Sequence, residues 1–228
     1  MKLVLFDIDQ TLLTPDGAGA AAMLNTLRDF YGVETVPAGY YMAGKIDTQI
    51  VMELLEHAGM DVAEAQARLP EYWALYAVEL ERLLPQHQVR ALDGAHHLLD
   101  ALEKRKDVIV GLLTGNLDAT AALKLRAVGL DPARFRVAAY GNEAQARSDL
   151  PPIAVSRAEA LVGHKFRGKD IVIVGDTPMD IACGESLGVR TIGVATGRYS
   201  VAELRAAGAD AVFPTLSDTA AVVAAILA

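Results

Sequence analysis

The sequence is poor in several features that mark particular classes of protein. It has a single cysteine, Cys183, among 228 residues, which excludes an internal disulfide framework and any cysteine-rich metal site. Apolar runs are short, and none approaches the roughly 20 residues that a membrane-spanning helix needs. The apolar start runs straight into acidic residues, unlike a signal peptide. We therefore expect a cytoplasmic protein that does not enter a membrane.

Positive charge and aromatic side chains are also scarce. The formal net charge is -8, and aromatic residues make up 6% of the chain. A surplus of acidic groups disfavours nucleic acid as a partner, although a local cluster of donors can still bind a small anion. Hydrophobic residues make up 52% of the chain, which suits one or two domains with a sizeable core. The choice between a monomer and a homodimer stays open.

The chain alternates short apolar runs with helical patterns. The runs are continuously apolar, which indicates strands buried on both faces. Their alternation with helices predicts an α/β fold with a doubly wound parallel sheet. The expected strands are Leu3–Phe6, Val108–Leu113, Val137–Ala139, Ile171–Val174, Thr191–Val194 and Ala211–Phe213. The expected helices between and after them are Leu117–Val128, Pro151–Val162, Met179–Leu187, Val201–Ala207 and Thr219–Leu227.

One segment interrupts this alternation. Between about residues 17 and 89 no strand is predicted, and three helical stretches occur instead, at Ala18–Tyr31, Thr48–Ala58 and Val62–Leu84. Turn sequences surround these helices. We interpret residues 16–89 as an all-helical domain, called the cap below, inserted into a core that consists of residues 1–15 and 90–228.

Polar residues collect directly after four of the expected strands, at the sheet edge where such folds bind ligands. They comprise Asp7, Asp9, Gln10, Thr11, Thr114, Gly115, Asn116, Asp176 and Asp180. Gathered carboxylates repel one another unless a cation compensates, and carboxylates with no histidine or cysteine beside them favour Mg²⁺ over zinc. Hydroxyl and backbone N–H donors at TGN and DQT suit phosphate oxygens. The sequence therefore predicts a Mg²⁺ site for a phosphate-bearing small molecule.

Asp7 and Asp9 could have two different roles in one reaction. Residues two apart share a face if the strand continues through Ile8. One carboxylate can act as a nucleophile and form an aspartyl-phosphate. A second, protonated carboxyl group can give its proton to the leaving alcohol and later activate water.

The stretches DIDQTLL, LLTGN and VGDTPMDIACGESLGVRTIGVATG resemble motifs one, two and four of the haloacid dehalogenase superfamily. The resemblance covers nearly the whole chain and is strongest to phosphoglycolate-phosphatase-like enzymes, which carry a helical cap after the first strand. It implies that Asp7 is the nucleophile and a Mg²⁺ ligand. It also implies that Asp9 is the general acid and base, with its backbone carbonyl on the metal.

The same resemblance implies roles for the later motifs. Thr114 and Asn116 would hold the phosphoryl group, Asp176 would bind Mg²⁺, and Asp180 would bind it directly or through water. The implied activity is Mg²⁺-dependent hydrolysis of a small phosphomonoester, phosphoglycolate-like or a sugar phosphate.

Three other activities compete with this interpretation. A phosphomutase of the β-phosphoglucomutase type shares the core and the cap. A phosphonoacetaldehyde-hydrolase-like enzyme would use Lys45 to form a Schiff base, but Asp9 argues against that group, which has a small residue there. A signalling receiver domain also carries a phosphorylatable aspartate, but it gains nothing from a cap or from a base that hydrolyses the phosphate.

The chain departs from the family pattern at two positions, and a cap residue is a further candidate for contact with substrate. Motif three normally supplies a lysine before a helix, and Arg147 is the candidate here, since arginine can bind phosphate through two parallel hydrogen bonds. Gln10 stands where many relatives have glycine, and we expect its side chain to point toward the cap and touch substrate. Lys45, in GYYMAGKIDTQI, could contact an anionic substrate end or be an ordinary lysine at a helix N-terminus.

Overall fold

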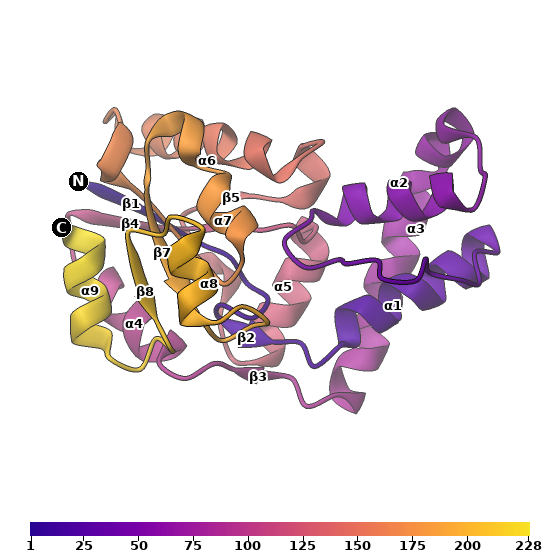
Figure 1. Cartoon of the computed structure of the whole chain (residues 1–228), viewed down its shortest axis with the longest axis horizontal. Coiled ribbons are helices and arrows are strands. Elements are labelled where there is room, and N and C mark those ends of the chain that lie inside the picture. Colours follow the sequence, from indigo (N-terminus) through magenta and orange to yellow (C-terminus); the bar gives the residue numbers. More distant parts are fainter.

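The computed structural model describes residues 1–228 and consists of an α/β core beside a group of helices (Figure 1). Six parallel strands form one sheet in the order β5-β4-β1-β6-β7-β8. The strands are β1 (Lys2–Phe6), β4 (Val108–Leu113), β5 (Val137–Ala139), β6 (Ile171–Gly175), β7 (Arg190–Val194) and β8 (Ala211–Phe213). The predicted α/β fold is confirmed, and every expected strand is present within one residue of its expected bounds.

The two faces of the sheet bury separate apolar clusters, because side chains alternate along each strand. On β1, Val4 and Phe6 face one layer, whereas Leu3 and Leu5 face the other. Helices α4, α5 and α9 cover the first face, and α6 covers the second. The core helices are α4 (Ala95–Glu103), α5 (Asp118–Ala127), α6 (Leu150–Val162), α7 (Pro178–Ala182), α8 (Val201–Ala206) and α9 (Thr219–Leu227).

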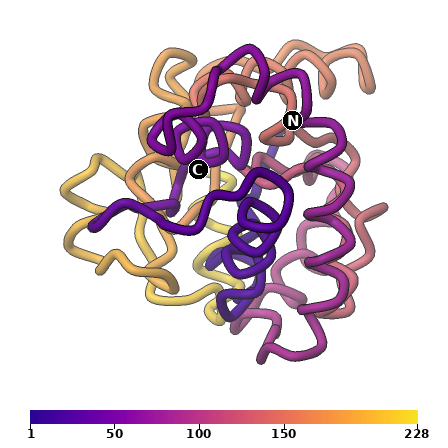
Figure 2. The backbone as a smooth tube through the Cα atoms, turned by 90° about the vertical axis from the view of Figure 1, so that its right-hand side faces the viewer, coloured from indigo at the N-terminus to yellow at the C-terminus, as the bar shows by residue number.

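The cap helices lie beyond the carboxyl ends of the strands, and both termini lie at the opposite end of the molecule (Figure 1). Figure 2 looks onto the molecule from the cap side. The helices are α1 (Ala18–Thr26), α2 (Asp47–His57) and α3 (Val62–Leu83), and a π-helical turn at Leu27–Tyr31 continues α1. They enclose a third apolar cluster that includes Tyr72 and Tyr76 from α3 and Leu117 from the core. The cap therefore packs on the core through apolar contacts.

The chain crosses between core and cap through a small antiparallel ribbon. Strand β2 (Leu13–Thr14) pairs with β3 (Arg90–Ala91), so the two crossings lie side by side. Strands of two residues are too short to show a periodicity, and the sequence pattern therefore gives no sign of them. The expected domain boundaries at residues 15/16 and 89/90 stay a prediction.

The expected helix Met179–Leu187 is wrong in its second half. Helix α7 ends at Ala182, and a separate 3₁₀ turn follows at Glu185–Leu187. Gly184 lies between them and packs so closely that a Cβ atom there would lie 2.3 Å from Val189 Cγ2. A close approach that only glycine permits thus interrupts the helix. None of the helices combines the length and the apolar character that crossing a membrane requires.

The cap cluster gives a test of the packing. Leu80 on α3 is fully buried, and Leu80→Ala is expected to lower the free energy of unfolding by about 2–5 kcal/mol. Leu75, on the same helix, is 44% exposed, and Leu75→Ala is the control, with a change below about 1 kcal/mol. Urea unfolding followed by circular dichroism compares the two variants, and equal losses would contradict the assignment of the buried face.

Candidate active site

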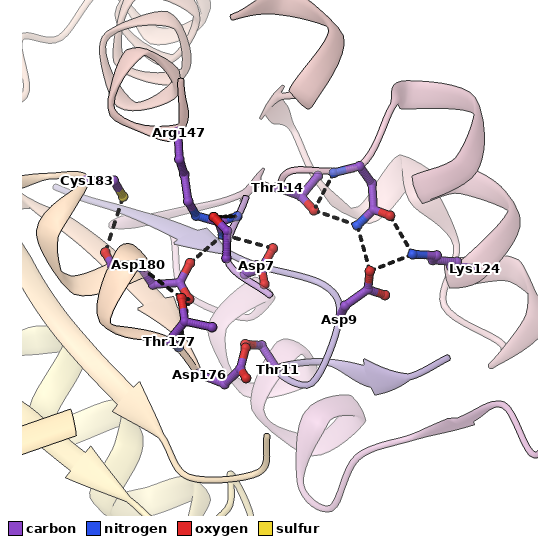
Figure 3. Close-up of polar contacts among 12 residues, drawn as sticks. Asp7, Asp9, Thr11, Thr114, Lys124, Arg147, Asp176, Thr177, Asp180 and Cys183 are labelled. Atoms are coloured by element: carbon purple, nitrogen blue, oxygen red, sulfur yellow. Dashed lines mark hydrogen bonds and ion pairs between the residues drawn. The ribbon is translucent and has the colours of Figure 1, made fainter. Parts of the chain in front are cut away.

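The side chains of Asp7 and Asp9, which follow the first strand, contact different partners. Strand β1 ends at Phe6, and the chain then turns, because the carbonyl of Ile8 accepts hydrogen bonds from the N–H groups of residues 11, 12 and 13 at 3.2, 2.9 and 3.1 Å. Ile8 continues the buried series of Val4 and Phe6 on one face of the sheet, so the turn follows it and the shared face of Asp7 and Asp9 stays a prediction. Asp7 points to Arg147 and Asp9 to Lys124, although both line one cavity (Figure 3).

Around Asp7, three buried carboxylates meet one buried guanidinium. Nη2 of Arg147 lies 3.1 Å from Oδ1 of Asp7 and also contacts the carboxylate of Asp180. Asp180 is held in turn by Thr177, whose backbone N–H and hydroxyl donate to Oδ2 at 2.9 and 2.7 Å. One carboxylate oxygen from each of Asp7, Asp176 and Asp180 lies within 4.8 Å of the others. Hard oxygen donors at this spacing fit a small divalent cation.

The raised pKa values of the clustered carboxyl groups also favour a bound cation. Burial raises the pKa of Asp7 to about 6, although Arg147 opposes the shift. Burial, together with the charges of Asp180 and Asp7, raises the pKa of Asp176 to about 9. One guanidinium therefore does not balance three buried carboxylates, and a further cation would favour their ionised forms.

Around Asp9, a second network is centred on Lys124. Its Nζ lies 2.5 Å from Oδ2 of Asp9 and 2.5 Å from Oδ1 of Asn116. Asn116 Nδ2 donates to the same Asp9 oxygen at 3.2 Å and to the hydroxyl of Thr114 at 2.9 Å. The other carboxylate oxygen of Asp9, Oδ1, is buried without a partner. Asp9 is thus held through one oxygen, and its second oxygen has no hydrogen-bond partner in the chain.

Lys124 was not among the candidates from the sequence, although a signal exists. In the helix α5, position 124 falls on the same face as the buried residues Thr120, Ala121 and Leu125. A lysine on the apolar face of a helix is unusual unless it is paired. Its partners are Asp9, 115 positions away, and Asn116 in the loop before α5, so the pattern alone could not name them.

Asp47 is a second residue that the sequence analysis missed. It is the first residue of α2, where acidic residues are common, because the positive end of the helix dipole favours a negative charge. In the structure it is only 7% exposed and lines the cavity. One of its oxygens, Oδ2, accepts a bond from the N–H of Leu117 at 3.4 Å. Burial raises the pKa of Asp47 to about 7.

Two predicted phosphate-binding threonines lie behind the cavity wall. Thr11 and Thr114 are fully buried and do not line the cavity. The hydroxyl of Thr11 points to Asp176 at 3.5 Å, and that of Thr114 accepts from Asn116. Both hydroxyls therefore bond within the wall, and their contact with phosphate stays a prediction.

Gly115 has a steric role beside its place in the cavity wall. A Cβ atom at Gly115 would lie 2.3 Å from the carbonyl oxygen of Lys45, and one at Gly141 would lie 1.9 Å from the carbonyl oxygen of Gly115. The N–H of Asp47 donates to that same oxygen at 2.8 Å. Gly115 therefore lets the cap loop before α2 lie directly against the core.

Gln10 and Lys45 both line the cavity, but their polar groups are already engaged. Gln10 has φ +61, the left-handed conformation that glycine adopts most easily. Its Nε2 donates to the hydroxyl of Thr14 at 3.2 Å, next to the crossing into the cap, and its contact with substrate stays a prediction. The turn folds the side chain back onto its own loop. Lys45 Nζ lies 2.5 Å from the carboxylate of Glu53 and 4.3 Å from the ring centre of Tyr40.

The cavity between the two networks and the cap has a volume of about 260 Å³. It runs from Asp7 and Asp176 on the core side to Ala20, Met23 and Ile50 on the cap side. A small molecule therefore fits with one end on the carboxylate cluster and the other against the cap.

The buried guanidinium provides a test of the charge balance. Arg147→Met removes the partner of two buried carboxylates and is expected to lower the free energy of unfolding by about 3–5 kcal/mol. Arg157 pairs with Glu143 at the surface, and Arg157→Met is the control, with a change below about 1 kcal/mol. Urea unfolding in the presence of a chelator measures both, and similar small losses would contradict the role given to Arg147.

Comparisons with known proteins place this geometry in a family context. A family model described as HAD-hydrolase-like matches residues 150–219. A search of curated proteins found no match. Among solved structures, a hydrolase from Pseudomonas syringae is 25% identical, with a TM-score of 0.72 and 98% of each chain covered.

Two further solved structures share the fold. CbbY from Rhodobacter sphaeroides, in complex with phosphate, is 18% identical, with a TM-score of 0.66 and 96% of each chain covered. A candidate β-phosphoglucomutase from Thermotoga maritima is 16% identical, with a TM-score of 0.64, and the match covers 98% of this chain and 99% of the other.

These findings agree with the residues of the site. The matched family segment contains Asp176 and Asp180, and the structural likenesses extend over the core and the cap. The three sequence motifs end on one cavity, in the order and on the strands that the resemblance implies. The sequence motifs, the geometry of the site and these comparisons therefore fit the haloacid dehalogenase superfamily of hydrolases with a helical cap.

Proposed function

We propose that the chain is a Mg²⁺-dependent phosphatase that hydrolyses a small phosphomonoester, phosphoglycolate-like or a sugar phosphate, through an aspartyl-phosphate on Asp7. The observation that carries this proposal is the separation of two carboxylates on one cavity. Asp7 lies beside Arg147 and the other acids, whereas Asp9 is held by Lys124 and keeps one oxygen without a partner. Such a pair suits a nucleophile and a separate proton donor.

Asp7, Asp176 and Asp180 would hold the metal, together with the backbone carbonyl of Asp9. The cluster of buried oxygen donors supports this choice of ligands. When bound, Mg²⁺ supplies positive charge that offsets the carboxylates and the phosphate oxygens.

In the first step, a carboxylate oxygen of Asp7 attacks phosphorus, and the bond between phosphorus and the alcohol oxygen breaks. Asp9 gives its proton to that oxygen from Oδ1, since Oδ2 is occupied by Lys124 and Asn116. Arg147, already in contact with Asp7, offsets the charge on the transferring group. Asn116 and Gly115, which line the cavity, bind the phosphoryl oxygens.

In the second step, Asp9 removes a proton from water, and the water oxygen attacks the phosphorus of the aspartyl-phosphate. The bond between Asp7 and phosphorus breaks, phosphate leaves, and Asp9 is again protonated for the next cycle. Thr114 keeps Asn116 in place, and Thr11 does the same for Asp176.

A phosphomutase is the second candidate, because a candidate β-phosphoglucomutase shares core and cap over nearly its whole length. The two activities differ in whether water or a sugar hydroxyl takes the phosphoryl group from Asp7. Release of inorganic phosphate without transfer to a sugar phosphate favours the phosphatase.

A Schiff-base mechanism at Lys45 fits the structure poorly. The ammonium group of Lys45 contacts the carboxylate of Glu53, and an ammonium group has no electron pair with which to attack a carbonyl. The presence of Asp9 argues in the same direction. Reduction by borohydride with a carbonyl substrate should leave no adduct on Lys45.

The nucleophile can be tested directly. Asp7→Asn is expected to reduce phosphate release from a panel of phosphomonoesters with Mg²⁺ by at least about 1,000-fold, because the amide cannot form the covalent intermediate. Asp118→Asn, at an exposed position on α5, is the control and should keep full activity. Substantial turnover by Asp7→Asn would refute the proposed role of Asp7.

The metal site has a signature in stability. In the metal-free protein, Asp176 keeps its proton up to about pH 9, whereas the unfolded chain releases it near the ordinary value of 3.8. The folded state thus binds more protons in this window, and its stability falls as the pH rises. We expect the gain in melting temperature on adding Mg²⁺ to grow from pH 5 to pH 9.

Asp176→Asn is the matched variant for this measurement. It removes one of the titrating ligands, and its gain from Mg²⁺ should be smaller and should rise less from pH 5 to pH 9 than in the unmodified protein. A gain from Mg²⁺ that is the same at both pH values in the unmodified protein would count against the metal site.

A further inference from the structure

We infer that the cap end of the cavity selects a phosphate ester whose organic part carries a hydroxyl group and rejects one that carries a carboxylate. This inference rests on the proposed phosphatase function and narrows its substrate class. It follows from three residues between the carboxylate cluster and the cap: Asp47, Tyr76 and Lys124.

Asp47 presents an unpartnered oxygen to the cavity. The side chain is more than nine-tenths buried, and its only hydrogen bond is the one from Leu117 to Oδ2. Oδ1 has no partner in the chain, and Asp47 lines the cavity. A buried carboxylate oxygen in this situation gains most from a donor that enters with the substrate.

Tyr76 supplies a hydroxyl group that complements this oxygen. Tyr76 comes from α3 and lines the same cavity, and no hydrogen bond joins its hydroxyl to another residue. Gly19 lacks a side chain at this place: a Cβ atom there would lie 3.0 Å from Nζ of Lys124 and 3.8 Å from the hydroxyl of Tyr76. Glycine at this position therefore lets α1 lie close to the ends of the Lys124 and Tyr76 side chains.

The positive charges that line the cavity are already paired. Lys124 contacts Asp9, Lys45 contacts Glu53, and Arg147 contacts Asp7 and Asp180. No other lysine or arginine lines the cavity. A substrate carboxylate near Asp47 would therefore meet a like charge without a free cation, which is costly in a buried site.

A hydroxyl group on the substrate is not repelled by the charge of Asp47 and needs no free cation. It is neutral, it can donate to Oδ1 of Asp47, and it can accept from the hydroxyl of Tyr76. The phosphate end, by contrast, lies toward Arg147 and the proposed metal. Charge is thus favoured at one end of the cavity and hydroxyl groups at the other.

Two phosphate esters of nearly equal size can show whether the site prefers a hydroxyl group or a carboxylate. 2-Hydroxyethyl phosphate carries a hydroxyl where phosphoglycolate carries a carboxylate. We compare kcat/KM for both with Mg²⁺ at pH 8, where Asp47 is ionised. The unmodified enzyme should prefer the hydroxyl ester by at least about tenfold.

Asp47→Asn removes the negative charge while it keeps the size of the side chain. We expect the preference for the hydroxyl ester to fall about 10- to 100-fold, chiefly through a gain on phosphoglycolate. Glu56→Gln removes an exposed charge from the same helix α2 and should leave the preference unchanged. Tyr76→Phe should lower kcat/KM for 2-hydroxyethyl phosphate relative to methyl phosphate, and it serves also if Asp47→Asn does not fold.

The outcomes distinguish this inference from the function on which it rests. If no phosphomonoester is hydrolysed with Mg²⁺, the proposed function is wrong. If methyl phosphate is hydrolysed but phosphoglycolate is as good as 2-hydroxyethyl phosphate or better, the function stands and the inference is wrong. An unchanged preference in both Asp47→Asn and Tyr76→Phe would also overturn it.

Discussion

Carboxylates buried together at one edge of a sheet need positive charge close by, and this need governs the arrangement around the cavity. Arg147 meets part of it by contacting Asp7 and Asp180 at once, and Lys124 meets another part by contacting Asp9. The high pKa of Asp176 shows that the balance is still incomplete. Under the proposed function a divalent cation would complete it, and the same charge would then serve the phosphate group of a substrate.

The contact between cap and core depends on close backbone approach. Gly115 and Gly141 have no side chains to separate the loop after β4 from the cap loop before α2. Asp47 donates its N–H to Gly115 and thereby carries its carboxylate to the cavity. The start of α2 is thus fixed against the loop after β4, for which we propose phosphate binding, and the cap contributes polar groups to the same cavity.

The strands and the gathering of the acidic residues could be predicted from the sequence, because the patterns that indicate them are local. Continuous apolar runs marked the strands, and the carboxyl ends of parallel strands meet at one edge, so Asp7, Asp176 and Asp180 had to lie close together. Arg147 was found because it stands before a helix, where the family places its basic residue. The ion pair of Arg147 with Asp7 agrees with that expectation, whereas its catalytic role stays a proposal.

Other features depend on contacts between distant segments. The turn at Ile8 sends Asp9 toward α5, and Lys124 meets it there across 115 positions of sequence. The hydroxyls of Thr11 and Thr114 bond within the wall, and Gln10 folds back onto Thr14, because the packing of the loops decides where short polar side chains point. The sequence by itself determined the α/β fold, the helical insertion and the identity of the acids, since these follow from periodicity and from strand ends. Only the tertiary structure decided which charges pair and that Asp47 lines the cavity, because burial and pairing arise when elements far apart in the chain pack together.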